Sequence, residues 1–164
     1  MTEDIMDKTA ENIAPRKSSG LKQAILLVED NPDDVELTLR AFKKNEFAHD
    51  VAVARDGAEA VDYLFATGNY ADRNPKEVPP LILLDLKLPK LNGLEVLKCI
   101  RENEVTKRVP VVILTTSDDD TDVINGYDLG VNSYIRKPVG FDVFMETVRQ
   151  LGLYWLNTNK NPPK

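Results

Sequence analysis

Cysteine and histidine are almost absent from the 164-residue sequence, which has only Cys99 and His49. One cysteine cannot close a disulfide bond within the chain, and one cysteine with one histidine cannot build a zinc cluster. We interpret Cys99 as a small apolar residue on a helix and His49 as an exposed residue at the start of a strand. A protein without disulfide bonds suits a reducing compartment, so we expect it to be cytoplasmic.

Long apolar runs and basic clusters are also missing. No stretch approaches the roughly 20 apolar residues of a membrane-spanning helix, and residues 1–22 lack the apolar centre of a signal peptide. The formal net charge is -6, and adjacent basic residues occur at most in pairs, such as Arg136-Lys137 before a proline. Attraction to polyanions is therefore weak. We expect no membrane partner and no nucleic-acid partner.

What the sequence does have is enough apolar material for one core, since 42% of its residues are hydrophobic. Its length fits one domain with a short extension at each end. Residues 1–22 are polar, with Pro15 and a Ser-Ser-Gly run, so we predict a disordered leader there. We predict a folded domain over residues 23–156 and a flexible tail over residues 157–164.

Short apolar runs alternate along the domain with amphipathic segments. Each run is too short for a helix and is typical of a strand buried on both faces; the runs are residues 24–28, 51–54, 81–84, 111–114 and 134–135. Helical spacing follows each run. We expect Asp33 and Asp34 to cap the first of these helices. In the last two helices we expect Ile124, Tyr127 and Val143 to face inward.

This alternation predicts an α/β fold with right-handed crossovers between parallel strands. At this size the natural arrangement is a doubly wound, flavodoxin-like sheet of five strands in the order 2-1-3-4-5, with helices on both faces. Residues 68–80 contain Gly68 and three prolines and interrupt the alternation. We predict a long surface loop there.

Polar residues stand where the predicted strands end. Glu29 and Asp30 follow the first strand, Asp85 follows the third, Thr115 follows the apolar run of the fourth, and Lys137 follows the fifth. In a doubly wound sheet the functional site lies beyond the carboxyl ends of the strands, where the strand order reverses. We therefore expect these five side chains to converge.

The chemistry of these residue types points to a phosphoryl group and a metal ion. Carboxylates held together raise one another's pKa unless a cation intervenes, and hard oxygen ligands suit Mg²⁺. We expect Asp85 to be the nucleophile on phosphorus, giving an acyl phosphate. Asp30 would bind the metal directly and Glu29 through water. Lys137 and Thr115 would donate to the phosphoryl oxygens.

The same residues carry a family resemblance. The signature positions occur in order over about residues 23–155 and resemble the receiver domain of two-component response regulators: Val28-Glu29-Asp30, Leu84-Asp85 with Pro89 and Gly93, Leu114-Thr115, Tyr134 and Lys137-Pro138. The resemblance implies that a sensor histidine kinase phosphorylates Asp85 in a reaction that needs Mg²⁺. It implies that the backbone carbonyl of Lys87 completes the metal site. It also implies a switch pair, Thr115 and Tyr134, and a cis peptide bond between Lys137 and Pro138.

Finer features narrow the resemblance. The insert before the third strand, the run from Asp85 to Pro89 and the tail Tyr154-Trp155-Leu156 are similar to the small single-domain regulators of bacterial and cyanobacterial phytochromes. This implies that the kinase is a phytochrome and that the protein forms a homodimer through the fifth strand and the last helix, on the side of Tyr134 and Phe144. We expect no output domain after the receiver domain, and therefore output through surface contacts or onward phosphotransfer.

Three other functions are alternatives to this one. A phosphohydrolase of the haloacid dehalogenase type also uses an aspartate at a strand end, but it needs a second acid at the position of Lys87. A flavodoxin would bind phosphate in the loop of residues 29–34, whose acids repel an anion. An interaction module that has lost phosphorylation remains an alternative. We favour a phosphoacceptor signalling protein that does not act as an enzyme on a diffusible substrate.

Overall fold

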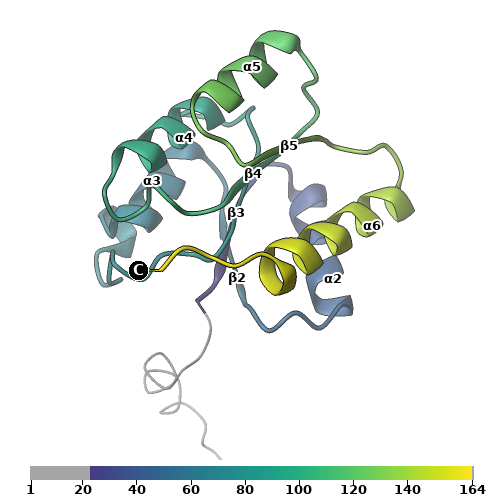
Figure 1. Ribbon diagram of the computed structural model, residues 1–164, viewed down its shortest axis with the longest axis horizontal. Coiled ribbons are helices and arrows are strands. Elements are labelled where there is room, and N and C mark those ends of the chain that lie inside the picture. Colours follow the sequence, from purple (N-terminus) through teal and green to yellow (C-terminus); the bar gives the residue numbers. More distant parts are fainter. Residues whose placement is uncertain (1–22, 164) are drawn as a thin grey trace, which may run out of the picture.

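The computed structural model describes residues 23–163, and the predicted leader lies outside this range. Its centre is one parallel sheet with the strand order β2-β1-β3-β4-β5, as predicted (Figure 1). The strands are β1 (Ile25–Val28), β2 (Val51–Ala54), β3 (Ile82–Leu84), β4 (Val111–Thr115) and β5 (Ser133–Arg136). The predicted doubly wound, flavodoxin-like fold is therefore confirmed.

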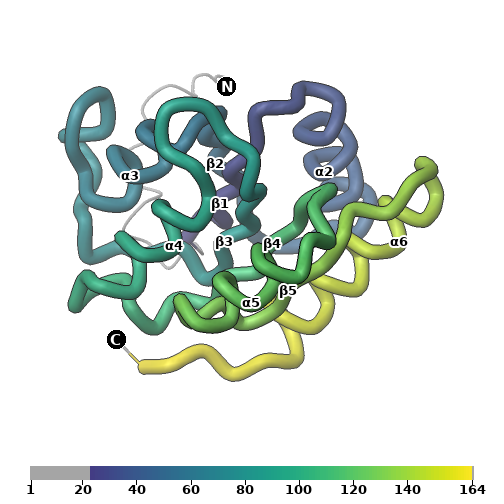
Figure 2. Tube along the Cα trace, turned by 90° about the horizontal axis from the view of Figure 1, so that it is seen from above, coloured from purple at the N-terminus to yellow at the C-terminus, as the bar shows by residue number. Residues whose placement is uncertain are grey.

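Helices cover both faces of the sheet. They are α2 (Pro32–Lys44), α3 (Gly57–Phe65), α4 (Gly93–Glu102), α5 (Asp120–Asp128) and α6 (Phe141–Gly152), with the short turns η2 (Gly68–Tyr70) and η3 (Leu153–Thr158). Figure 2 shows α2 and α6 on one side of the sheet and α3, α4 and α5 on the other. Within residues 23–163 no helix is long and apolar enough to span a membrane.

The core lies on the two faces of the central strands. The residues of β1, β3 and β4 are all buried. Leu26, Leu84 and Ile113 belong to the cluster under α3 and α4, and Leu27 and Leu83 to the cluster under α2 and α6. Burying one such side chain contributes about 1.5–3 kcal/mol. This burial on both faces explains why these strands are continuous apolar runs.

The register of the sheet places the strand ends side by side. Val28 of β1 pairs with Leu84 of β3, so the residues that follow them, Glu29 and Asp85, leave neighbouring strands at the same level. The Asp85 N–H donates to the Val28 carbonyl at 3.0 Å. The strand order reverses between β1 and β3, which is where a doubly wound sheet opens a crevice for a ligand.

The start of α2 differs from the prediction. The side chain of Asn31 is the N-cap and accepts from the N–H groups of Asp33 at 2.9 Å and Asp34 at 3.2 Å. Pro32 explains the difference, because proline fits the first position of a helix and so moves the cap to the residue before it. The carboxyl group of Asp34 is therefore available for another contact.

The predicted loop over residues 68–80 packs against α3 and forms hydrogen bonds with it. The Arg73 guanidinium lies over the Tyr63 ring, 3.9 Å from its centroid. It also donates to the carbonyl groups of Tyr63 and Glu77. The Tyr70 hydroxyl donates to the carboxylate of Glu59 on α3. The segment is a surface loop, as predicted, with a defined conformation.

Some apolar residues predicted to face inward are exposed. Ile124 and Tyr127 on α5 and Val143 on α6 keep 58%, 52% and 56% of their surface. The prediction was wrong because helical spacing identifies an apolar face without showing what covers it. Both helices lie near β5, which is an edge strand of the sheet (Figure 2).

Candidate functional site

Three carboxylates gather at the carboxyl end of the sheet. Glu29, Asp30 and Asp85 each offer an oxygen atom, and these atoms lie within 4.8 Å of one another. Glu29 and Asp85 are buried, whereas Asp30 is exposed. Burial, together with the negative charge of Asp85, raises the pKa of the Glu29 carboxyl to about 7, although a hydrogen bond from Lys137 acts in the opposite direction. The contact with Lys137 therefore does not fully offset the effects of burial and of the neighbouring negative charge on Glu29.

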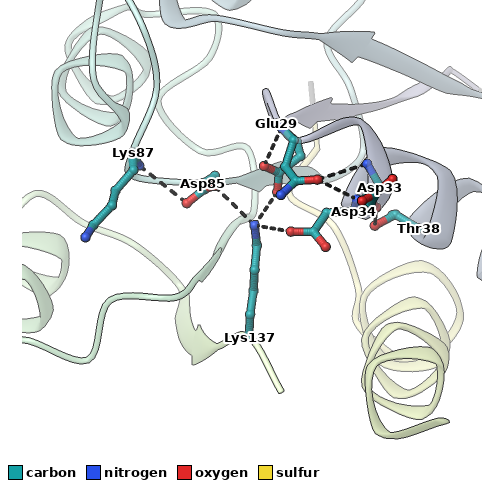
Figure 3. A network of polar contacts seen from close by, with 8 residues as sticks. Glu29, Asp33, Asp34, Thr38, Asp85, Lys87 and Lys137 are labelled. Atoms are coloured by element: carbon teal, nitrogen blue, oxygen red, sulfur yellow. Dashed lines mark hydrogen bonds and ion pairs between the residues drawn. The ribbon is translucent and has the colours of Figure 1, made fainter. Parts of the chain in front are cut away.

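Lys137 is the cation of this edge. Its Nζ lies 2.6 Å from Glu29 Oε1, 2.7 Å from Asp34 Oδ2 and 3.2 Å from Asp85 Oδ2 (Figure 3). An ammonium group has three N–H donors, so these contacts use all of them. Burial alone would lower the pKa of Lys137, but the hydrogen bonds to Asp34 and Glu29 and the charge of Asp85 outweigh it and raise the pKa.

Asp34 is the site residue that the sequence analysis missed. It was expected to cap α2, and its partner Lys137 lies 103 positions away in the sequence. A signal was present, because the pair Asn31-Pro32 already fixes the cap of the helix. With the cap assigned to Asn31, the acid in the first turn of α2 stands near the end of β1 and could have been included.

Thr115 is the last residue of β4, and its hydroxyl group is in an unusual environment. It is fully buried, and within residues 23–163 its Oγ1 is the one buried side-chain nitrogen or oxygen atom without a hydrogen-bond partner. Leaving such a hydroxyl unpaired costs about 1–3 kcal/mol. A cost of this kind is often found where a ligand supplies the missing partner.

Tyr134 lies on β5, which pairs with β4. Its hydroxyl donates to the backbone carbonyl of Ser117 at 2.9 Å, two residues beyond Thr115. The Ser117 hydroxyl in turn donates to the Asp122 carboxylate at 2.6 Å. Tyr134 is thus linked to the segment that follows Thr115.

The loop after β3 brings α4 close to Asp85. A Cβ atom at Gly93 would lie 2.3 Å from the Asp85 carbonyl oxygen, so only glycine allows this approach. The Lys87 N–H makes a long 3.4 Å contact to Asp85 Oδ1, and the Lys87 side chain points away from Lys137 (Figure 3). All peptide bonds of the described residues are trans. The expected cis bond before Pro138 is therefore not found, and Lys137 reaches the acids from the trans form, the commoner isomer of such bonds.

The donor set fits a hard divalent cation. Glu29, Asp30 and Asp85 offer carboxylate oxygens only, and Mg²⁺ and Mn²⁺ both accept such ligands. A dication would also reduce the repulsion that raises the pKa of Glu29. The structure thus brings together Glu29, Asp30, Asp85 and Lys137 as predicted, with Thr115 at the end of the neighbouring strand β4.

A doubly wound sheet with an acid cluster, a buried lysine and a strand-end threonine at its switch point is the arrangement of a receiver domain. The family described as response regulator receiver domain matches residues 25–149. The chain belongs to this family.

Relatives with known names agree with this assignment. The chain is 41% identical to the probable methanogenesis regulatory protein FilR2 of Methanothrix harundinacea, over 84% of this chain and 86% of that protein. It is also 41% identical to the response regulator Rcp1 of Synechocystis sp., over 83% of this chain and 90% of that protein.

Solved structures give the same result. The phosphorylated cyanobacterial phytochrome response regulator RcpA matches with a TM-score of 0.80 and 42% identity, over 87% of this chain and 99% of that chain. The Mn²⁺-bound form of Rcp1 matches with a TM-score of 0.80 and 40% identity, over the same shares of the two chains. The expected resemblance to phytochrome response regulators is confirmed.

Proposed function

We propose that the protein accepts a phosphoryl group on Asp85 from the phosphohistidine of a sensor histidine kinase, in the presence of Mg²⁺, and changes its surface when phosphorylated. One observation carries this proposal. The Asp85 carboxylate belongs to an acid cluster suited to a cation and also contacts the ammonium group of Lys137.

The residues divide the work of the transfer among them. An Asp85 carboxylate oxygen attacks phosphorus, the bond between phosphorus and the histidine nitrogen breaks, and the imidazole leaves with that electron pair. Lys137 and the Thr115 hydroxyl donate hydrogen bonds to the phosphoryl oxygens and so stabilise charge in the transition state. The unpaired Thr115 Oγ1 would gain its missing partner in this way.

Metal binding would use the acid cluster. Asp30, Asp85 and the backbone carbonyl of Lys87 would hold Mg²⁺, with Glu29 acting through a water molecule. When bound, the ion would neutralise negative charge on the incoming phosphoryl group. The relative solved with Mn²⁺ supports a divalent cation in this family, and the oxygen-only ligands of this chain suit Mg²⁺ equally.

Thr115 and Tyr134 form the proposed switch. A Thr115 side chain drawn toward a phosphoryl oxygen would pull on the segment that follows it, including the Ser117 carbonyl. That carbonyl accepts from the Tyr134 hydroxyl, so the ring on β5 would move with it. The signal would thereby pass from the buried acids to the surface formed by α5, β5 and α6.

The partners follow from the surface and the relatives. We propose a phytochrome kinase as the donor, because similar structures include RcpA and the bacteriophytochrome response regulator RtBRR, the latter with 48% identity. We propose a homodimer through β5 and α6. Phe144, which was expected on this face, is buried in the core, whereas Phe141 and Val143 at the start of α6 are 51% and 56% exposed and would make the contact. The net charge of -6 argues against nucleic acid. Localisation in the cytoplasm fits a kinase partner of this type.

An enzyme acting on diffusible phosphate esters is the less favoured function. The position two residues after Asp85, where such an enzyme needs a second acid, is the exposed Lys87. A lysine there does not supply the second carboxylate that such an enzyme uses as its general acid and base. We therefore propose that the phosphoryl group is transferred to Asp85 and not from there to a diffusible small-molecule substrate, apart from hydrolysis of the acyl phosphate itself.

The test is phosphorylation by a small donor. We expect acetyl phosphate with Mg²⁺ to add one phosphoryl group, seen by intact mass, which hydroxylamine removes because it cleaves acyl phosphates. Asp85→Asn should take up none, and neither should the wild type with a chelator. An adduct that persists in Asp85→Asn, or no adduct on the wild type, would contradict the proposal.

A further inference from the structure

Asp34 holds Lys137 from outside the acid cluster. The cluster that suits a cation consists of Glu29, Asp30 and Asp85. Asp34 lies instead in the first turn of α2, and its Oδ2 is 2.7 Å from Lys137 Nζ. Figure 3 shows the two side chains pointing toward each other, with Asp85 on the other side of the ammonium group.

The ammonium group has no N–H left for another acceptor. Its three donors are used by Glu29, Asp34 and Asp85. The proposed transfer needs Lys137 to donate to a phosphoryl oxygen on Asp85. One of the three present contacts must therefore be given up when the phosphoryl group arrives.

Asp34 is the contact that can be released most easily. Its side chain is 22% exposed, whereas the side chain of Glu29 is only 5% exposed, and an unpaired carboxylate is far less costly near water than in the interior. Asp34 also lies at the positive end of a helix, which stabilises a carboxylate without the lysine. The contact with Asp85 is not lost in the proposed transfer, because Lys137 would then donate to the phosphoryl group that Asp85 carries.

We propose that Asp34 is a positioning residue that competes with the phosphoryl group for Lys137 and thereby restrains phosphorylation of Asp85. The pair of Asp34 and Lys137 stabilises the unphosphorylated protein and is absent from the transition state and the product. An interaction made only in the ground state slows the reaction and reduces the extent of phosphorylation at equilibrium.

The inference rests on the proposed function and predicts the effect of one neutral substitution. Asp34→Asn removes the charge and keeps the size of the side chain. We expect it to raise the phosphorylation rate with acetyl phosphate at saturating Mg²⁺ about fivefold, which is the size expected for a partly exposed ion pair. The phosphorylated fraction at steady state should rise as well.

The chain offers a matched control in Asp33. This residue precedes Asp34 in the same first turn, is exposed and is not among the ion-pair partners of Lys137. Asp33→Asn therefore removes the same charge from the same helix end. We expect it to change the rate by less than about twofold. Asp34→Glu keeps a carboxylate within reach of Lys137 and should bring the rate back toward that of the wild type.

A double mutant separates competition for Lys137 from a general effect of charge. In a Lys137→Met background Asp34 has no ammonium group to bind, so Asp34→Asn should no longer accelerate phosphorylation. If the charge of Asp34 acted only by repelling the phosphoryl group, the acceleration would persist or grow when the lysine is removed. Circular dichroism checks that each variant is folded.

The rates are measured by intact mass over time for the wild type and all variants. An acceleration in Asp34→Asn that is missing in Asp33→Asn and reversed in Asp34→Glu supports the inference, even if Lys137→Met does not fold. Equal or slower phosphorylation in Asp34→Asn, or an acceleration that survives in Lys137→Met, overturns it. A wild type that takes up no phosphoryl group overturns the proposed function as well, so the two failures are distinguishable.

Discussion

Arg101 at one end of the sheet and Lys137 at the other each contact several oxygen atoms, but the partners of the two cations differ in charge. At the amino ends of the strands, Arg101 donates to the carbonyl groups of Lys107, Val109 and Gly130 and to the Asn132 side chain. At the carboxyl ends, Lys137 meets three carboxylates. The arginine has only neutral partners, whereas the lysine lies in an excess of negative charge.

We interpret this difference as one between a cation that stabilises the fold and a cation that acts in the proposed phosphotransfer. Arg101 joins the end of α4 to the segments that lead into β4 and β5, and all of its partners are hydrogen-bond acceptors that need a donor. Around Lys137 the Glu29 carboxyl has a raised pKa and the Thr115 hydroxyl has no partner. Strain of this kind is kept in a fold where a ligand relieves it.

The largest effect on stability is expected at the amino end. Arg101→Ala leaves several carbonyl groups without a donor, so we expect it to lower the free energy of unfolding by about 2–4 kcal/mol, measured by urea denaturation. Phosphorylation by acetyl phosphate at low temperature should remain close to that of the wild type. Arg108→Ala is the control, because this neighbouring arginine is exposed, and should cost less than about 0.5 kcal/mol.

A large loss of phosphorylation in folded Arg101→Ala would break the comparison, since it would make the amino end part of the functional site. A loss of stability no greater than in Arg108→Ala would show that the contacts of Arg101 contribute little to the fold.

The next effect is a dependence of stability on pH at the carboxyl end. The pKa of Glu29 is raised from 4.5 to about 7 in the folded protein, first by burial. The folded state therefore binds a proton that the unfolded state has released, and stability falls as the pH rises from about 4.5 to 7. We expect this fall in thermal unfolding with a chelator present, and a smaller one in Glu29→Gln.

Excess Mg²⁺ should sharpen this contrast. A ligand that binds only the folded state at 100 times its Kd adds about 2.7 kcal/mol of stability. The gain should grow as the pH rises through about 7, where Glu29 loses its proton. A metal-free stability that rises with pH over this range, or a melting temperature that Mg²⁺ does not change, would contradict the charge assignment.

The smallest effect on stability is expected on the surface beside β5. Phe141 is 51% exposed, so Phe141→Asp should change the free energy of unfolding by less than about 0.5 kcal/mol. It should nevertheless weaken the proposed homodimer, measured by sedimentation equilibrium with and without acetyl phosphate. Val105→Asp is the control, because Val105 is also exposed, at 45%, and lies between α4 and β4. A wild type that stays monomeric both with and without acetyl phosphate would contradict the proposed homodimer.

The sequence predicted the sheet and most of the site for a common reason. Glu29 and Asp85 each follow a buried strand and Lys137 follows the partly exposed β5. The topology of a doubly wound sheet brings such strand-end positions together. Neither the position of a strand end in the sequence nor its place in the sheet depends on side-chain conformation. The predicted strand order and the contact between Lys137 and the acids were therefore both accessible.

Contacts that depend on where a long side chain reaches could not be predicted in this way. Arg101 binds groups that lie up to 31 positions further along the chain, and nothing in its neighbourhood in the sequence indicates them. Asp34 was assigned to the helix cap because Asn31, Asp33 and Asp34 are all good capping residues. Helical spacing placed Tyr127 inward because a face that meets solvent or a partner has the same period as a face that meets the core.

One measurement tests the central claim most directly, namely that the charged end of the sheet accepts the phosphoryl group while the other end only supports the fold. Wild type, Asp85→Asn and Arg101→Ala are incubated in parallel with acetyl phosphate and Mg²⁺, and each is examined by intact mass before and after hydroxylamine. We expect one hydroxylamine-labile phosphoryl group on the wild type and on folded Arg101→Ala, and none on Asp85→Asn. A labile phosphoryl group on Asp85→Asn, or none on the wild type, would contradict the claim.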